Sequence, residues 1–173
     1  MQTKKIACPR GVGCAVAGLG FSVGSVELSE QGLLAVRNVP VAEAWERLKR
    51  NPKTQLVDVR TKAEWNFVGV PDLSKIGRAV ILIEWQTYPQ GATTEDFTDR
   101  CAAAIEAAGA TPDDEVFFLC RSGARSLSAA RAMAGIGFSK CLNVAEGFEG
   151  PLDDHRHRSL AGWKVAGLPW YQA

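Results

Sequence analysis

Short runs of apolar residues recur along this chain, and stretches with helical spacing lie between them. The runs cover residues 56–59, 79–83, 116–119 and 141–144, and most of their members are Val, Ile, Leu or Phe. Runs of this length, with little alternation of polar residues, are typical of strands buried on both faces of a parallel sheet. We therefore expect four strands at these positions.

Between these runs, apolar residues recur every three or four positions in three stretches. The first covers 40–49, and the second covers 94–108, with Thr94 as the expected N-cap and Gly109 as the stop. The third begins at about Ser126 and ends at the glycines that follow it. Strands that alternate with helices at short intervals indicate an α/β fold, an open parallel sheet flanked by helices.

Residues 1–36 differ in composition from the rest, because glycine, alanine and valine dominate and basic residues stand near the start. We expect a flexible N-terminal extension there, followed by a single domain over 37–173. A signal peptide is the alternative, but Pro9 and Arg10 interrupt the early apolar stretch and no small-residue cleavage site stands out. The segment is also too short and too weakly apolar to span a membrane.

Length and charge narrow the class of protein. A chain of 173 residues can bury one sizeable core. Its 20 basic and 19 acidic side chains give a formal net charge of +1. Because this balance provides no general attraction to nucleic acid or to a membrane surface, we expect neither as a partner.

The strand at 116–119 leads into Cys120, which opens the run Cys-Arg-Ser-Gly-Ala-Arg-Ser before an alanine-rich helix. Open α/β sheets bind ligands at this carboxyl edge. The helix N-terminus attracts anions, and Arg121 and Arg125 add positive charge. These features favour the thiolate, which is the nucleophilic form of cysteine. An inert buried cysteine is the alternative, but it would not need two arginines and a glycine so close by.

The residues after Cys120 are expected to hold an anionic substrate. The arginines suit an anionic group, a glycine lets the backbone turn closely around the sulfur, and successive loop amides can form a nest for negative charge. The serine hydroxyls can donate hydrogen bonds, although Ser126 as a helix cap is an alternative. We predict Cys120 as the catalytic residue and, as substrate-binding residues, Arg121, Ser122, Gly123, Ala124, Arg125 and Ser126.

The chain has five cysteines, an odd number without a disulfide-like framework. Cys101 and Cys141 fall within the predicted helix 94–108 and the predicted strand 141–144, where a free cysteine packs as a small apolar residue. Free thiols suit a reducing compartment. We therefore expect a cytoplasmic protein, with export as the alternative if residues 1–36 are a signal.

Metal binding has weak support in the sequence. Cys8 and Cys14 lack the spacing of a zinc site, and their role stays open. His155 and His157 lie in a dense run of charged residues that is typical of a solvated loop. We expect neither a metal nor another cofactor.

Three further segments accompany the cysteine loop. Leu-Val-Asp-Val-Arg-Thr-Lys-Ala-Glu-Trp occupies 56–65, Asn-Val-Ala-Glu-Gly-Phe-Glu-Gly occupies 143–150, and a tail follows from Trp163 to Trp170. Together with 120–126 these segments resemble, in the same order, the motifs of the rhodanese-like single-domain sulfurtransferase family. The resemblance covers about residues 38 to 173. It implies a rhodanese-like fold and a Cys120 that carries transferred sulfur as a persulfide, without a cofactor.

The resemblance has one departure and one informative detail. Gly69 is followed by Val70 and Pro71, where the family usually has a histidine and a β-branched residue, so the next strand is uncertain at that point. Arg121 directly after the cysteine is similar to members that prefer thiosulfate, and a dianion suits positive charge at the mouth of the site.

Three residues are expected around the site rather than in the loop. Asp58 and Arg60 end a strand at the same sheet edge as Cys120, where they would either line the pocket or buttress its loops. Trp65 and Trp85 are candidates for an apolar wall, with core packing as the alternative, and we place Trp85 beside the site.

The predicted function is sulfur transfer from thiosulfate or a similar donor to a thiophilic acceptor through a Cys120 persulfide. The partners implied are a small sulfur-donor anion, a thiol or cyanide acceptor, and a sulfur-carrier protein. A cysteine-dependent phosphatase or arsenate reductase is one alternative. Such loops usually place the arginine six positions after the cysteine, whereas Arg125 is five positions on. A non-catalytic or redox-sensing binding module is the other.

Overall fold

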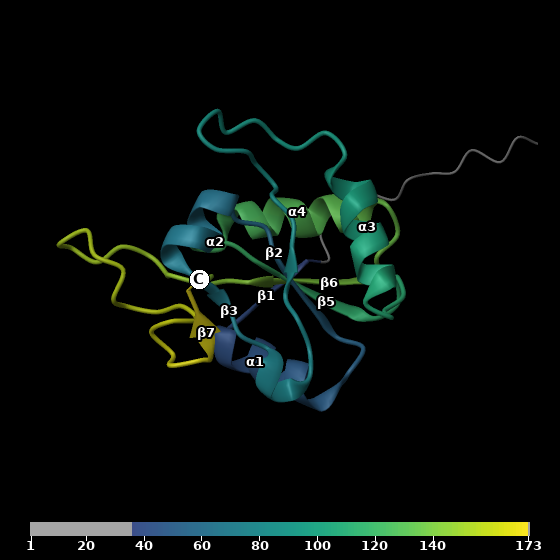
Figure 1. Cartoon of the computed structure of the whole chain (residues 1–173), viewed down its shortest axis with the longest axis horizontal. Coiled ribbons are helices and arrows are strands. Elements are labelled where there is room, and N and C mark those ends of the chain that lie inside the picture. The colour runs from purple at the N-terminus through teal and green to yellow at the C-terminus, as the bar shows by residue number, and fades with distance from the viewer. Residues whose placement is uncertain (1–35, 173) are drawn as a thin grey trace, which may run out of the picture.

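The four apolar runs supply four strands of a parallel five-stranded sheet, and a further strand, β1 (Arg37–Val39), lies at one edge (Figure 1). The strand order is β1-β6-β5-β2-β4. A computed structural model describes residues 36–172. The strands of the sheet are β1 (Arg37–Val39), β2 (Gln55–Asp58), β4 (Ile81–Leu82), β5 (Glu115–Leu119) and β6 (Lys140–Val144). The predicted open parallel α/β sheet is confirmed.

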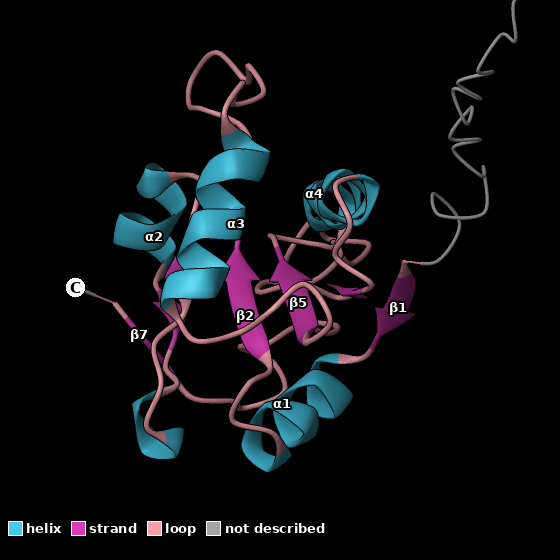
Figure 2. Cartoon of the chain, turned by 90° about the vertical axis from the view of Figure 1, so that its right-hand side faces the viewer, coloured by secondary structure: helices cyan, strands magenta, loops and turns pink. Residues whose placement is uncertain are grey.

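Helices cover both faces of this sheet (Figure 2). Their bounds are α1 (Val41–Arg50), α2 (Lys62–Val68), α3 (Phe97–Ala107) and α4 (Ala124–Gly135), with a short 3-10 helix, η2 (Ser74–Ile76). One buried cluster lies between the sheet and α1, and another lies between the sheet and the pair α3 and α4. The core therefore consists of two apolar layers with the sheet between them.

Strand β5 shows how the alternation of side chains places the cysteine. Phe117 and Leu119 pack in the cluster with α1, whereas Val116 and Phe118 pack in the cluster with α3 and α4. Successive strand residues point to opposite faces. Cys120 continues the series on the side of α4 and belongs to the same buried cluster as Phe118.

The carboxyl ends of the central strands are aligned, as the sequence predicts. Asp58 of β2 pairs with Leu119 of β5, and Phe118 pairs with Asn143 of β6. Just beyond the strands, the N–H of Val59 donates to the carbonyl of Leu119 at 2.8 Å. The segments that follow β2, β5 and β6 are thus brought to one edge of the sheet.

Two predicted helix starts are wrong. The helix after the cysteine begins at Ala124 rather than near Ser126, because Gly123 adopts a left-handed φ of 93° and serves as the N-cap. Helix α3 begins at Phe97, and Thr94 does not cap it, since its hydroxyl donates to the carbonyl of Glu84 at 2.8 Å. The predicted end of α3 before Gly109 is confirmed.

The expected buried strand over 79–83 is also corrected. Strand β4 contains only Ile81 and Leu82 and forms an edge of the sheet, where Leu82 is 39% exposed. The segment at Val70 and Pro71 forms β3 (Val70–Pro71), which pairs antiparallel with β7 (Trp170–Tyr171). The residues that depart from the family motif therefore form a strand, and this strand pairs with the C-terminal tail.

Cys101 and Cys141 are buried, as expected from the sequence, with 0% and 4% exposure. Burial raises the pKa of each thiol to about 12, and for Cys101 the neighbouring Cys141 adds to the effect. Both thiols are protonated at neutral pH, and buried protonated thiols are poor nucleophiles.

The residues considered for metal binding and for the N-terminal extension lie at the surface of the domain or outside the described residues. His155 and His157 lie in an exposed loop, and within residues 36–172 no cluster of His, Cys, Asp and Glu is arranged to hold a metal ion. The predicted extension and Cys8 and Cys14 lie outside the described residues, apart from Val36.

Candidate active site

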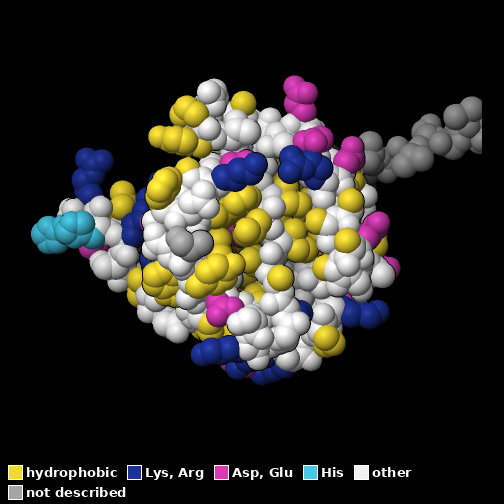
Figure 3. Space-filling view, viewed as in Figure 1, with side chains coloured by type: hydrophobic (Ala, Val, Ile, Leu, Met, Phe, Trp, Pro, Cys, Tyr) yellow, Lys and Arg dark blue, Asp and Glu magenta, His cyan; other side chains and the backbone are white. Residues whose placement is uncertain are grey.

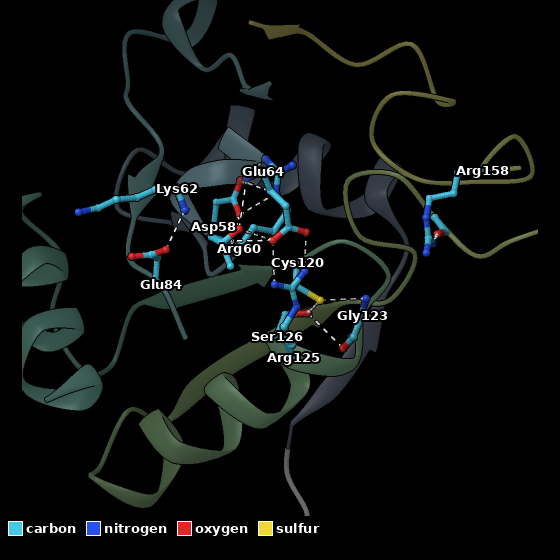
Figure 4. Close-up of polar contacts among 12 residues, drawn as sticks. Asp58, Arg60, Lys62, Glu64, Glu84, Cys120, Gly123, Arg125, Ser126 and Arg158 are labelled. Atoms are coloured by element: carbon cyan, nitrogen blue, oxygen red, sulfur yellow. Dashed lines mark hydrogen bonds and ion pairs between the residues drawn. The ribbon is translucent and has the colours of Figure 1, made fainter. Parts of the chain in front are cut away.

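Cys120 lies directly beyond β5, at the floor of the loop that leads into α4. Its Sγ accepts a hydrogen bond from the backbone N–H of Gly123 at 3.2 Å and lies 3.2 Å from the hydroxyl of Ser126 (Figure 4). The side chain is 1% exposed. Since the N–H comes from the N-terminus of a helix, this contact favours negative charge on the sulfur.

The backbone of the cysteine loop rests on the turn after β6. A Cβ on Gly123 would lie 2.2 Å from the carbonyl oxygen of Ala145, so only glycine fits this contact. The N–H of Phe148 donates to the carbonyl of Cys120 at 2.8 Å. A Cβ on Gly147 would lie 2.5 Å from the same carbonyl. The segment 143–150 is therefore the support against which the loop is shaped.

A chain of hydrogen bonds connects the sulfur to the sheet. Ser126, which is fully buried, donates its hydroxyl proton to Oδ1 of Asn143 at 2.6 Å. Nδ2 of Asn143 donates to Oδ1 of Asn38 at 2.7 Å. A hydroxyl has a single proton, so Ser126 turns its lone pairs toward Cys120 in this arrangement. Asn143, as the nearest acceptor, and the carbonyl of Gly123, at 3.1 Å, thus compete with Cys120 for the Ser126 proton, and Ser126 does not act as the helix cap.

Replacing Asn143 by alanine is expected to speed alkylation of Cys120 by iodoacetamide at pH 6 by about three- to tenfold. Without the amide, the Ser126 hydroxyl becomes free to donate to the thiolate, and one such hydrogen bond is worth about 0.5–1.5 kcal/mol. The measurement is the alkylation rate against pH. In a Ser126→Ala background the same replacement should have no effect, and an unchanged or slower rate in the single variant would contradict this account.

Arg125 is held by an acidic partner from α2. Its guanidinium donates to both carboxylate oxygens of Glu64, at 2.8 and 2.6 Å. Glu64 also accepts from the backbone N–H of Thr61, within the capping box that begins α2. The positive charge that the sequence predicts for Arg125 is therefore paired, because the helix cap places a carboxylate beside it. Arg121 is exposed.

Glu64 should make the stability of the fold depend on pH in the acidic range. Burial alone raises the pKa of Glu64, but the hydrogen bonds from Arg125 and Thr61 outweigh it and lower the pKa from 4.5 to about 2. Since the pKa is lowered on folding, the stabilisation is present above pH 4.5 and is lost as the pH falls toward 2. It amounts to at most about 3 kcal/mol.

The measurement is urea unfolding of the wild type and of Glu64→Gln at pH 6 and pH 3. Glutamine keeps the capping box but does not titrate. We expect the wild type to lose about 2 kcal/mol more than the variant between the two pH values. Equal losses in the two proteins would show that the pair of Glu64 and Arg125 adds nothing.

A pocket of about 600 Å³ opens above Cys120. One wall is α2, the second is the segment 86–91, and the third is the cysteine loop. Figure 3 shows hydrophobic side chains, in yellow, spread over much of the face of the molecule that is turned toward the viewer. Four of the predicted substrate-binding residues line the pocket, namely Arg121, Ser122, Ala124 and Arg125. The other two, Gly123 and Ser126, lie beneath it.

Asp58 and Arg60 buttress the site and do not line the pocket. Both side chains are 0% exposed and form an ion pair at 2.6 Å. Arg60 also donates to the carbonyl of Gly69 at 2.7 Å, at the end of α2. The sequence left open whether the pair lines the pocket or supports its loops. The pair is a support, because it connects the end of β2 to the helix that forms one wall of the pocket.

Trp85, which the sequence analysis places near the site, packs against the buried cluster that also contains Cys120. Its ring packs edge-on against Phe97, with 4.9 Å between the ring centres, and it is not part of the pocket wall. The apolar wall is provided by Phe67 and Val68 of α2 and by Tyr88 of the segment 86–91.

Sequence reasoning missed Glu64, Phe67, Tyr88 and Asn143 as parts of the site. The spacing of Glu64, three residues after Thr61, is a capping-box signal, and Phe67 follows it by about one helical turn. Asn143 was a polar residue in an otherwise apolar strand. Nothing in the local sequence marks Tyr88.

The fold and the loop define an α/β domain that presents one cysteine, in contact with a helix N-terminus, at the carboxyl edge of a parallel sheet. Residues 40–152 match the family described as Rhodanese-like domain. The chain belongs to this rhodanese-like family, which fits sulfurtransferase chemistry at the level of the family.

This chain aligns with nearly the whole length of two related proteins. Uncharacterized protein RC0915 of Rickettsia conorii is 36% identical over 141 residues, covering 79% of this chain and 98% of that protein. Uncharacterized protein RP600 of Rickettsia prowazekii is 37% identical over 137 residues, with the same coverage of 79% and 98%.

Solved structures agree with the fold. The crystal structure of Rv0390 from M. tuberculosis shares 44% identity and a TM-score of 0.70, covering 80% of this chain and 98% of that one. The solution structure of a polysulfide-sulfur transferase homodimer from Wolinella succinogenes has 19% identity and a TM-score of 0.51, with 83% of each chain covered, and shows similarity of fold alone. Within residues 36–172, no helix has the length and apolar character needed to cross a bilayer.

Proposed function

We propose that this protein is a sulfurtransferase that moves a sulfane sulfur from thiosulfate or a similar donor to a thiophilic acceptor through a persulfide on Cys120. The observation that carries the proposal is the contact between Sγ of Cys120 and the N–H of Gly123 at the start of α4, beneath an open pocket. The same N–H that stabilises a thiolate also suits the charge of a persulfide.

The reaction proceeds by two displacements. The Cys120 thiolate attacks the outer sulfur of thiosulfate, the bond between the two thiosulfate sulfurs breaks, and its electron pair leaves with sulfite. The enzyme then holds the transferred sulfur as a persulfide. An acceptor such as cyanide or a thiolate attacks the terminal sulfur and restores the Cys120 thiolate, so that no external oxidant or reductant is consumed.

The side chains around the loop have distinct parts in this proposal. Arg121, at the exposed rim of the pocket, attracts the anionic donor. Ser126 lies beside the sulfur and donates to it once the proton turns away from Asn143. Arg125 and Glu64 form a rigid pair in the wall. An acceptor thiol on a sulfur-carrier protein and a cytoplasmic setting both fit the free thiols.

Phosphatase or arsenate reductase chemistry is less well supported. It requires an arginine that wraps around a tetrahedral oxyanion, whereas Arg125 is engaged through both carboxylate oxygens of Glu64. A purely structural binding module does not account for a cysteine held against a helix N-terminus beneath a pocket. Sulfur transfer accounts for the contact between Cys120 and the helix N-terminus and for the open pocket above it.

The experiment is intact-protein mass spectrometry after thiosulfate treatment, with Cys120→Ser as the matched variant. We expect the wild type to gain the mass of one sulfur atom, to lose it on addition of cyanide, and to release thiocyanate. Cys120→Ser should gain nothing. A folded wild-type protein whose Cys120 reacts with iodoacetamide but takes no sulfur from any sulfane donor would refute the proposal.

A further inference from the structure

Helix α2 forms one wall of the pocket, yet it has little packing of its own. It has 7 residues, and none of them is buried. Phe67, in its last turn, is 79% exposed. The N-terminus of the helix is held by the capping box and by the N–H of Lys62, which donates to the carboxylate of Glu84 at 2.8 Å. A helix this short is not stable alone, so contacts at its other end also determine where it lies.

The C-terminal tail supplies contacts at that other end. Nζ of Lys164 donates to the carbonyl of Val68 at 3.3 Å, and Nε2 of Gln172 donates to the carbonyl of Phe67 at 2.9 Å. Carbonyls in the last turn of a helix have no partner within the helix. The ammonium of Lys164 therefore satisfies one of them and places a positive charge at the negative end of the helix dipole.

The ammonium of Lys164 is itself held by aromatic rings. It lies 3.8 Å from the ring centre of Trp170 and 5.9 Å from that of Phe148, at cation–π distances. The ring of Trp170 also lies against the end of α2, since a Cβ on Gly69 would approach it to 2.9 Å. The half-buried side chain of Lys164 is therefore fixed between the tail and the helix.

The backbone of the same lysine is bonded to the support of the cysteine loop. The N–H of Lys164 donates to the carbonyl of Phe148 at 3.1 Å, and the N–H of Phe148 donates to the carbonyl of Cys120 at 2.8 Å. One residue thus connects the turn beneath Cys120, through its backbone, with the helix that walls the pocket, through its side chain. A shift of Lys164 would therefore change the distance between the cysteine loop and α2.

The position of α2 matters because this helix carries Glu64 to Arg125. The two hydrogen bonds of that pair, at 2.8 and 2.6 Å, would be lost if α2 moved by about 1 Å or more, since hydrogen bonds weaken steeply beyond about 3.2 Å. Hydrogen bonding to Glu64 raises the pKa of Arg125 in spite of its burial, and the charge of Cys120 adds to the effect. The other ionisable residues that line the pocket are Arg121 and Tyr88. Arg125 is thus held within electrostatic range of the sulfur.

We infer that Lys164 is a positioning residue of the active site, because it holds α2 where Glu64 meets Arg125 beside Cys120. Lys164 does not line the pocket and acts through the carbonyl of Val68. Its effect on catalysis rests on the proposed sulfur transfer through Cys120, whereas its effect on the pair of Glu64 and Arg125 is measurable without a donor.

The first experiment measures how much of the acid sensitivity of the fold depends on Glu64 when Lys164 is replaced. Urea unfolding at pH 6 and pH 3 is compared between Lys164→Met and Lys164→Met combined with Glu64→Gln. We expect the extra loss of stability that Glu64 causes at pH 3 to fall to no more than about half of its value without the lysine replacement, because the displaced carboxylate keeps its cap but no longer meets Arg125. A purely structural Lys164 would lower the stability at both pH values and leave this difference intact.

Three variants make the result specific. Lys164→Arg keeps a cation over Trp170 and should restore the full difference. Lys53→Met removes the same charge from an exposed side chain just before β2, at the opposite edge of the sheet from the pocket, and should leave the difference unchanged. Gln172→Ala removes the contact at the exposed end of the tail and should narrow the difference in the same direction, so it serves as the test if Lys164→Met does not fold.

The second experiment measures the consequence for catalysis. We expect kcat/KM for thiosulfate and cyanide to fall about fivefold in Lys164→Met, mainly through a higher KM for thiosulfate, and to recover in Lys164→Arg. The contact between the N–H of Gly123 and Cys120 does not involve α2, so kcat should change less than about twofold. A general loss of folded enzyme would lower kcat and leave KM unchanged.

The outcomes separate this inference from the proposed function. An unchanged Glu64-dependent difference in both Lys164→Met and Gln172→Ala, or a fall in kcat with KM unchanged, would overturn the positioning role and leave sulfur transfer standing. A wild type that takes no sulfur from any sulfane donor would overturn the proposed function, while a narrowed difference in Lys164→Met would still support the positioning of Glu64.

Discussion

Gly123→Ala is expected to reduce sulfur transfer by about 100-fold or more. The added Cβ would lie 2.2 Å from the carbonyl oxygen of Ala145, and no side-chain rotation can relieve a contact that is fixed to the backbone. The loop must then move away from the turn after β6. The N–H of Gly123, which donates to Sγ of Cys120 at 3.2 Å, moves with it. The loss of one such donor to a reacting anion commonly costs a factor of about 10²–10³.

The measurement is kcat/KM for thiosulfate:cyanide sulfur transfer, together with the midpoint of urea unfolding. Gly109→Ala is the matched control, because Gly109 has a similar φ of 83° and its added Cβ would meet nothing within 4 Å. It should lose about 1 kcal/mol of stability and keep its activity. If Gly123→Ala were as active as this control, the contact with Ala145 would not shape the catalytic loop.

Asp58→Ala is expected to destabilise the fold by about 3–5 kcal/mol. The carboxylate of Asp58 accepts hydrogen bonds from Nε and Nη2 of Arg60, and neither side chain is exposed to solvent. Removing the carboxylate leaves the guanidinium buried without its counter-charge. Nη1 of Arg60 already has no hydrogen-bond partner among the described residues, and the group stacks over the ring of Phe148 at 4.0 Å. This loss is large against a typical stability of about 5–15 kcal/mol.

The measurement is the free energy of unfolding in urea, and a double variant makes the test specific. Asp58→Ala combined with Arg60→Met should recover at least half of the loss, since no charge then remains buried. The control is Glu46→Ala, which breaks the pair with Lys49, whose side chains are 48% and 40% exposed, and should cost less than about 1 kcal/mol. A similar cost for Asp58→Ala and Glu46→Ala would mean that water reaches the inner pair.

The sequence by itself determined the parallel sheet, the place of Cys120 at its edge and the burial of Cys101 and Cys141. These follow from periodicity, because a short apolar run fixes a strand and the residue after it emerges at the carboxyl edge. The family could be predicted for a related reason. Its motifs are local strings, such as residues 120–126, whose chemistry is carried by neighbours in the chain.

Only the tertiary structure decided how those residues are used. Arg125 meets Glu64 from a helix 61 positions earlier, and Ser126 meets Asn143, 17 positions later. Trp85 and Tyr88 both follow the strand that ends at Leu82, yet Trp85 packs against the core and Tyr88 borders the pocket. Charge pairing and pocket shape depend on contacts between distant segments, and no local pattern encodes such contacts. The charge pairing and the shape of the candidate site therefore follow from the fold.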